Sequence, residues 1–132
     1  AHNLATLNNG KVSAIGLYGN DYYAPILLNA MKEAGINTEY MVEDSNRPTT
    51  VKSRISGASF HSVTQQIVRV DRVENSAPSA EIEKAIPEHD AVILSDYNIG
   101  FLTENIIRTA IETARKFGKI IVVDAQKDLW RY

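Results

Sequence analysis

The stretch AVILSDYNIGFLT, residues 91–103, constrains the fold more than any other part of this sequence. Four apolar residues run straight into Ser95 and Asp96, and a glycine and the potential helix start Thr103 follow. This pattern predicts a buried strand that delivers a carboxylate to the loop at its C-terminal end. In open α/β sheets, ligands bind at that edge. The stretch therefore predicts an α/β fold with Asp96 at a ligand-binding edge.

Apolar spacing predicts strands and helices in alternation along most of the chain. Strands are expected over residues 11–17, 38–42, 90–94 and 119–123, and helices over 21–34, 79–86 and 103–117, after a short helix in the first residues. That order predicts a mostly parallel sheet covered by helices, with right-handed crossovers. Each long helix should bury one apolar stripe. The stripes are Tyr22, Tyr23, Ile26, Leu27, Ala30, Met31 and Ala34 in the first, and Ile106, Ile107, Ala110, Ile111, Ala114 and Phe117 in the second.

Two extended and mostly polar segments interrupt this alternation, at residues 49–56 and 63–73. The sequence between them, GASFHS, is typical of a hairpin turn. Because an antiparallel pair with so few apolar residues makes a poor core, it is better suited to cover another part of the molecule. We therefore expect a small antiparallel β-lid over about residues 43–73, inserted between strand–helix units.

Composition excludes several classes of function. The 132 residues predict one domain, and a net charge of −2 with a pI near 5.9 argues against nucleic-acid or membrane partners. The absence of cysteine excludes thiol catalysis, disulfides and cysteine zinc sites, and it fits a cytoplasmic protein. His2, His61 and His89 lack metal-ligand spacing, so they are expected at the surface and no metal site is expected. The sequence also has no Walker A motif and no dinucleotide fingerprint.

Three aspartates are candidate site residues. Asp96 and Asp124 each follow a predicted buried strand, and consecutive strand–helix units bring such strand ends together. Two acids at one edge are suited to contacts with hydroxyl groups or a metal ion. The alternative is that each aspartate caps a helix or sets a turn. Asp21 follows Gly19 after the first strand. The glycine would let a ligand approach the backbone, and the acid can bind sugar hydroxyls. The alternative is that the two residues form a turn and a helix cap.

Three of the cations in the expected lid form a candidate cluster. Lys52 and Arg54 alternate onto one face of its first strand, and Arg69 on the second strand could join them. Such a cluster would suit a phosphorylated ligand. The alternative is a solvated edge strand, where lysine prevents aggregation.

Four passages together resemble the middle of ribokinase-like, PfkB-type carbohydrate kinases. AHNLA resembles the tail of the family's Gly-Gly-x-x-x-Asn sugar motif, and GLYGND resembles the Gly-x-Asp step that follows it. RPTTVKSRI with QQIVRVD resembles the family's lid, and LSDYNIGFLT resembles its Ser-Asp-Tyr-x-Lys-Gly-x-Leu-Thr. The resemblance covers essentially the whole chain. It looks nearest to the heptose-7-phosphate kinase domain of ADP-heptose synthases.

The resemblance implies a ribokinase-like central sheet between helices, with a β-lid over the sugar. It also implies transfer of the γ-phosphoryl group of ATP, with Mg²⁺, to a hydroxyl of a sugar or sugar phosphate. By position, the sugar contacts would be Asn3, Gly19, Asp21, Lys52, Arg54, Gln66 and Asp96. Asp124 and Gln126 would lie on the nucleotide side, although neither ATP nor Mg²⁺ is expected to bind this stretch by itself. Because family lids often pair, a homodimer through the lid is an expected partner arrangement.

The sequence departs from the family in three respects. The catalytic Gly-Ala-Gly-Asp motif, the first strand and most of the nucleotide site have no counterpart here, so residues 1–132 are expected to be a partial domain without kinase activity. The lysine after Ser-Asp-Tyr is Ile99, and the family's Asp-Pro-Lys is Asp124-Ala125-Gln126. Each change removes a cation whose hydrogen bond to phosphate is worth roughly 1.5–3 kcal/mol. The sugar is therefore left open, and a non-catalytic sugar-binding or dimerisation module is the alternative.

Overall fold

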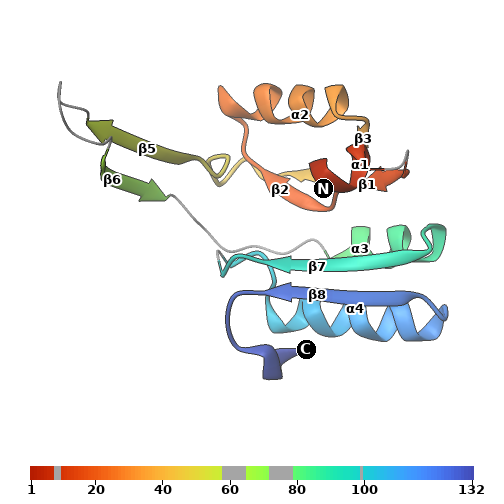
Figure 1. The fold of residues 1–132 in the computed structure, drawn as a ribbon. Helices are drawn as coiled ribbons and strands as arrows, with labels where there is room; N and C mark the ends of the chain where they lie inside the picture. Colours follow the sequence, from red (N-terminus) through yellow and green to blue (C-terminus); the bar gives the residue numbers. More distant parts are fainter. Residues whose placement is uncertain (8–9, 58–64, 72–78, 99) are drawn as a thin grey trace.

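The computed structural model describes residues 1–7, 10–57, 65–71, 79–98 and 100–132 (Figure 1). A short helix, α1 (His2–Thr6), is followed by two strand–helix–strand units, and an antiparallel hairpin comes between these units in the sequence. The strands within each unit pair in parallel. The α/β prediction of parallel strands joined by helices is confirmed.

The C-terminal unit consists of β7 (Ala91–Asp96), α4 (Glu104–Lys116) and β8 (Ile120–Ala125). The two strands pair without interruption, from Ala91 opposite Ile120 to Asp96 opposite Ala125. Thr103 caps α4, because its hydroxyl accepts a hydrogen bond from the Ile106 N–H at 3.4 Å. Gly118, with a φ of +62°, ends the helix. The sequence predicted this unit to within about two residues at each boundary.

The main apolar core lies where α4 packs against β7 and against α3 (Ser79–Ala85). A 3₁₀ turn, η1 (Ile86–Glu88), continues α3 around Pro87. Burial of each large aliphatic side chain contributes roughly 1.5–3 kcal/mol to this core. Its buried residues are Ile82, Ile86, Leu94, Leu102, Ile106, Ile107, Ala110 and Ala114.

Phe117, which was predicted to join the buried stripe of α4, is 46% exposed. It is the C-cap residue of the helix. The ammonium group of Lys116 lies 5.4 Å from the centre of its ring, a cation–π contact at the surface. The stripe was predicted correctly for the interior of the helix and wrongly for its last position.

The N-terminal unit is less regular. Its strands are β1 (Val12–Ser13), β2 (Gly16–Tyr18), β3 (Ile36–Asn37) and β4 (Met41–Glu43), around α2 (Tyr23–Glu33). The two continuous strands predicted over residues 11–17 and 38–42 were wrong in this respect. β1 pairs with β3 and β2 with β4, and the register between the two pairs shifts by one residue across the turn at residues 39–40.

Helix α2 buries only part of the predicted stripe, which was right for Leu27, Met31 and Ala34 and wrong for the others. Ala24 is its buried residue, and the half-buried Leu27, Leu28 and Met31 follow it at helical spacing. Tyr22 and Tyr23, which were predicted to be buried, are largely exposed, and Ile26 is 50% exposed. Tyrosines count as apolar in a spacing argument, although their hydroxyl ends favour water.

The hairpin pairs β5 (Lys52–Gly57) with β6 (Gln65–Asp71) in antiparallel register, which confirms the antiparallel pair predicted within residues 43–73. The register shifts between Ile55 and Ser56, as in a β-bulge. The predicted turn at residues 58–62 lies outside the described residues, as do residues 63–64 and 72–73 of the expected second strand and Ile99. Figure 1 shows the hairpin on the side toward which the arrowheads of β7 and β8 point. The hairpin therefore lies toward the carboxyl ends of these strands, where ligands bind in α/β folds.

Candidate functional site

The carboxylate of Asp96 is buried at the end of β7 and is bound by other residues of the chain. The residue is 7% exposed. Its Oδ1 accepts a hydrogen bond from the Asn98 N–H at 2.7 Å, and its Oδ2 accepts one from the Tyr132 hydroxyl at 2.5 Å. A guanidinium nitrogen of Arg131 lies 3.5 Å from the same Oδ2, and Arg131 also donates to the Leu102 carbonyl at 2.8 Å. Asp96 therefore sets a turn through its bond to the Asn98 N–H, which is one of the roles that the sequence left open for it.

The segment that binds Asp96 is a 3₁₀ turn, η2 (Leu129–Arg131), together with Tyr132. Burial raises the pKa of the Tyr132 hydroxyl to about 12, and its hydrogen bond to the Asp96 carboxylate adds to this effect. The hydroxyl therefore stays protonated and remains a donor at neutral pH. Sequence reasoning missed both Arg131 and Tyr132, because nothing in their local pattern connects them with a residue 35 and 36 positions earlier, respectively.

Asp96 and Asp124 reach the same end of the β7–β8 pair but lie on opposite faces of it. Asp124 is opposite Ser95 in the register, and Asp96 is opposite Ala125. Because side chains alternate along a strand, Asp124 shares the exposed face with Ser95, whereas Asp96 shares the face of the buried Leu94. The structure brings the two strand ends together, as the sequence indicated, without bringing the two carboxylates to one side.

Asp21 lies between the end of β2 and the start of α2, and its two oxygens have different partners. Oδ1 accepts hydrogen bonds from the N–H groups of Tyr23 at 3.0 Å and Ala24 at 3.1 Å, so Asp21 caps α2. Oδ2 accepts a hydrogen bond from the Thr49 N–H at 2.8 Å. The hydrogen bond with the Thr49 hydroxyl, followed by those of the three N–H groups, lowers the pKa of the Asp21 carboxyl below its usual 3.8 against the opposing effect of burial. The helix-cap alternative is therefore present at Asp21, with an added link to Thr49.

Gly19 is buried beside this carboxylate. Its N–H donates to the Thr49 hydroxyl oxygen at 3.0 Å. The structure thus brings the predicted pair Gly19 and Asp21 together with Thr49, a buried residue that was noted only as part of the lid resemblance.

The register of the hairpin brings the lid cations together along the backbone. Arg54 is directly opposite Arg69, and Lys52 is opposite Asp71. Directly opposed residues of an antiparallel pair share a face, and like charges at such positions are unfavourable to the pairing. Gln66 is opposite Ser56, beyond the register shift.

The remaining predicted positions lie at the surface. Asn3 is exposed in α1, and Gln126 is exposed just beyond β8. His2 is exposed as predicted, and His61 lies outside the described residues. His89, however, is half-buried, and the surface position predicted for it is wrong. Its Nδ1 is 2.7 Å from the Ala85 carbonyl oxygen and its Nε2 is 2.7 Å from the Ser13 hydroxyl.

A polar joint around His89 links the two units of the fold. Besides its contact with Ser13 of β1, its ring makes an edge contact with the buried Tyr40, at 6.1 Å between ring centres. The Tyr40 hydroxyl donates to Glu88 Oε2 at 2.6 Å, and this hydrogen bond, with burial, raises the pKa of Tyr40 to about 12. The two units are therefore joined by hydrogen bonds between β1, the turn before β4, and η1.

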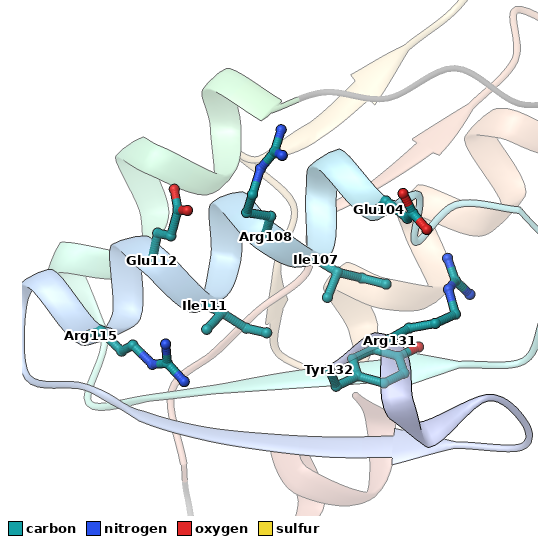
Figure 2. A pocket seen from close by; sticks show the side chains of 8 residues that line it. All are labelled: Glu104, Ile107, Arg108, Ile111, Glu112, Arg115, Arg131 and Tyr132. Atoms are coloured by element: carbon teal, nitrogen blue, oxygen red, sulfur yellow. The ribbon is translucent and has the colours of Figure 1, made fainter.

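A shallow groove of about 290 Å³ runs along the side of α4 that faces Tyr132 (Figure 2). Ile107 and Ile111 line its floor opposite the Tyr132 ring, and Arg108, Arg115 and Arg131 alternate with Glu104 and Glu112 around it. The residues that line it include none of the predicted sugar contacts. It lies on the helix side of β7 and β8, apart from the hairpin.

The described residues do not fit a Mg²⁺–ATP site. Within those ranges, no group of three or more histidine, aspartate or glutamate side chains lies close enough to hold a metal ion. Asp124 and Gln126, which the resemblance placed on the nucleotide side, are both exposed. In the same ranges, no helix has the length and apolar character needed to cross a membrane.

Sequence comparison identifies relatives over the full chain. The family described as pfkB family carbohydrate kinase matches residues 1–130. The bifunctional protein HldE of Helicobacter pylori is 37% identical over 141 aligned positions, and the match covers 100% of this chain and 29% of that protein. The HldE of Sulfurimonas denitrificans is 37% identical over 131 positions, with 93% of this chain and 26% of that protein covered. The chain thus spans less than a third of the length of these relatives.

Solved structures with the same fold are more distant in sequence. The 2-dehydro-3-deoxygluconokinase of Thermotoga maritima superposes with a TM-score of 0.76 at 16% identity, over 99% of this chain and 41% of that one. A PfkB protein from a Polaromonas species gives a TM-score of 0.75 at 19% identity, over 99% of this chain and 45% of that one. Parallel strand–helix units with an antiparallel hairpin at the carboxyl ends of the strands thus define the class as a ribokinase-like α/β fold. With the match over residues 1–130, the chain belongs to the pfkB family of carbohydrate kinases.

Proposed function

We propose that this chain is the sugar-binding and lid portion of an ATP-dependent kinase that phosphorylates a hydroxyl of a sugar or sugar phosphate. Membership of the pfkB family is the observation that carries the proposal. The position of the hairpin supports it, because β5 and β6 lie toward the carboxyl ends of β7 and β8. Since such a reaction consumes ATP, the proposed compartment is the cytoplasm.

A phosphorylated sugar is the substrate class that the lid register favours. Lys52, two residues before Arg54, is opposite Asp71, whereas Arg54 is directly opposite Arg69, so that two positive charges oppose each other on one short antiparallel pair. An anion between them would convert a repulsive arrangement into a favourable one. Similarity to the HldE proteins makes heptose 7-phosphate the first candidate. Ile99 and Gln126, where the family has lysines, leave room for another sugar phosphate.

The residues proposed to contact the sugar differ in how free their side chains are. Asn3 and Lys52 are exposed, and together with Arg54 and Gln66 they remain proposed sugar contacts. Asp96 also remains a proposed contact, but its carboxylate is already bound by Tyr132 and Asn98. A sugar hydroxyl would have to share or displace one of these donors.

Calorimetric titration of the protein with heptose 7-phosphate and with the unphosphorylated heptose tests the proposal. Arg54→Ala or Lys52→Ala should weaken binding of the phosphorylated sugar about tenfold or more, because each removes a charge-assisted hydrogen bond. The affinity for the unphosphorylated sugar should change little. Lys116→Ala, on an exposed position of α4, is the matched control. Equal losses for both sugars would exclude a phosphate contact at the lid, and unchanged affinity in both lid variants would exclude the lid as part of the site.

We also propose that residues 1–132 do not transfer phosphoryl groups by themselves. The Gly-Ala-Gly-Asp motif that supplies the family's catalytic base and anion hole does not occur in the sequence. Positioning and charge stabilisation provide nearly all the rate enhancement in phosphoryl transfer, so the loss of these groups should abolish turnover. A coupled assay of ADP release should show no turnover with these 132 residues, and sugar-dependent ADP release would refute the proposal.

A non-catalytic module that pairs through the lid is the second candidate. In the described part of the hairpin, β5 and β6 pair only with each other, so each presents one unpaired edge. Such edges can add a strand from a second copy of the chain. Light scattering coupled to size-exclusion chromatography would show a dimer that Ser53→Pro on β5 dissociates. A monomer at all concentrations would remove this candidate.

A further inference from the structure

Asp21 connects two parts of the fold that are far apart in the sequence. Its Oδ1 holds the N–H groups of Tyr23 and Ala24 at the start of α2. Its Oδ2 holds the N–H of Thr49, 28 residues later, at 2.8 Å. The carboxylate therefore joins the start of the helix to the chain just before the hairpin.

Thr49, the partner of Asp21 in this junction, is buried, with 4% of its surface exposed. Its hydroxyl accepts a hydrogen bond from the Gly19 N–H at 3.0 Å and donates one to the Gly19 carbonyl oxygen at 3.5 Å. Two backbone N–H groups and one hydroxyl are thus satisfied within a small buried cluster. Because a buried polar group without a partner is destabilising, the members of such a cluster hold one another in place.

Gly19 provides the room for this junction. A Cβ atom added at this position would lie 2.1 Å from the Arg47 carbonyl oxygen and 2.6 Å from the Thr49 nitrogen. Both are backbone atoms, so no side-chain movement could relieve the overlap. The segment from Arg47 to Thr49 is therefore seated directly on the end of the first strand–helix unit, and β5 begins three residues later at Lys52.

We propose that Asp21 is a positioning residue that anchors the base of the β5–β6 hairpin to the N-terminus of α2 through Thr49. Gly19, which has no side chain, lets the backbone of Arg47 to Thr49 pack closely enough for this contact. Asp21 was considered as a direct sugar contact or as a helix cap, and neither role requires the bond to Thr49. The anchor itself is independent of the proposed function. Its consequence, that Asp21 fixes where the lid closes over a sugar, rests on the proposed function.

Asp21→Asn separates the anchor from the cap. Asparagine keeps an Oδ1 that can accept from Tyr23 and Ala24, and it is as good a helix cap as aspartate. Its Nδ2 is a donor, however, and would face the donor N–H of Thr49. The amide proton of Thr49 should then exchange about tenfold faster or more, because a hydrogen bond to a charged group is lost. The amide protons of Tyr23 and Ala24 should keep their chemical-shift signatures, whereas Asp21→Ala should lose both sets.

Thr49→Val tests the other half of the anchor. Valine matches threonine in shape but lacks the hydroxyl, so the Gly19 amide proton should lose its protection while Thr49→Ser should retain it. Because both substitutions break one cluster, the Asp21→Asn/Thr49→Val pair should be non-additive in the exchange of the β5 amides. Thr103→Val removes the cap of α4 and should leave the Gly19 and Thr49 amides unchanged.

The proposal would be refuted if the Thr49 amide proton of Asp21→Asn exchanges at the wild-type rate while the α4 amides remain protected. If the α4 amides lose their protection as well, the variant has unfolded, and the Gly19 amide in Thr49→Val decides instead: protection there equal to wild type would overturn the proposal.

Titration with a sugar phosphate adds the functional readout. An anchor predicts weaker binding in Thr49→Val as well as in Asp21→Asn, whereas a direct sugar contact predicts it only for Asp21→Asn. Absence of any sugar binding would refute the proposed function and leave the amide results standing.

Discussion

The two strand–helix–strand units share one connectivity but are held together differently. In the C-terminal unit, β7 and β8 pair over their whole length and α4 buries Ile106, Ile107, Ala110 and Ala114. In the N-terminal unit, the strands are broken by a register shift, and Ala24 is the one buried residue of α2.

Polar contacts position the N-terminal unit to a greater extent. Asp21 joins α2 to Thr49, Tyr40 binds Glu88, and Ser13 binds His89. Apolar burial is strong and non-directional, whereas hydrogen bonds are weaker but geometrically specific. We infer that the C-terminal unit supplies most of the stability, and that the N-terminal unit sets the direction in which the lid leaves the fold.

The largest expected contrast is between an isoleucine on each helix. Ile106 on α4 is 0% exposed, and Ile26 on α2 is 50% exposed. Ile106→Ala should lower the free energy of unfolding by about 2–5 kcal/mol, because it removes buried methyl groups and leaves a cavity. Ile26→Ala should change it by about 0.5 kcal/mol or less. Urea denaturation followed by circular dichroism measures both values, and similar losses would refute the division between a core unit and a polar unit.

A smaller contrast is expected between the two aspartates at the ends of β7 and β8. Asp96→Asn should cost about 1–3 kcal/mol, because it weakens a buried hydrogen bond to Tyr132 and replaces an acceptor next to Arg131. Asp124→Asn, on the exposed face, should be close to neutral. If Asp96→Asn is also neutral in denaturation but impairs sugar binding, Asp96 is a ligand contact and its internal hydrogen bonds contribute little to stability.

The sequence predicted those parts of the fold in which local pattern and tertiary packing agree. In the stretch 91–117, an apolar strand, a threonine cap and a periodic helix all indicate the same unit, and the structure has it. In the stretch 11–43, the apolar residues also suited continuous strands. The turn at residues 39–40 breaks them, since Tyr40 packs beside His89 and binds Glu88, a partner 48 residues away that no local pattern shows.

The candidate site was predictable in position but not in the roles of its side chains. Asp21 and Asp96 were identified as carboxylates at strand ends, and both are there. Their partners are Thr49, Arg131 and Tyr132, which come together only when the chain folds. The sequence does not show whether the oxygens of a carboxylate already accept hydrogen bonds from other residues of the chain. Only the structure distinguishes a side chain that is available to a ligand from one that is bound internally.

Capping provides a third and smaller contrast between the units. The α4 cap, Thr103, makes a single bond within its own helix, whereas the α2 cap, Asp21, also binds Thr49. Thr103→Val should therefore cost about 1 kcal/mol of global stability, with Thr103→Ser as the control that keeps the hydroxyl. It should not alter amide exchange in β5. A change confined to β5 in this variant would show that α4 also sets the lid, contrary to the comparison.

The smallest effect should appear in acid and be confined to the N-terminal unit. The hydrogen bonds from Thr49, Tyr23 and Ala24 keep the pKa of Asp21 in the folded protein below 3.8, its usual value. A carboxyl with a lowered pKa stabilises the fold fully above its unfolded pKa, and this contribution disappears as the pH falls through the lower folded value. The Thr49 amide signal should therefore shift with a midpoint below pH 3.8, while the signals of α4 stay in place until global unfolding. Asp21→Asn should remove this local step. A midpoint at or above 3.8 in the unmodified protein would mean that the carboxylate gains nothing from its bonds to Thr49, and the N-terminal unit would then be held by packing like its C-terminal counterpart.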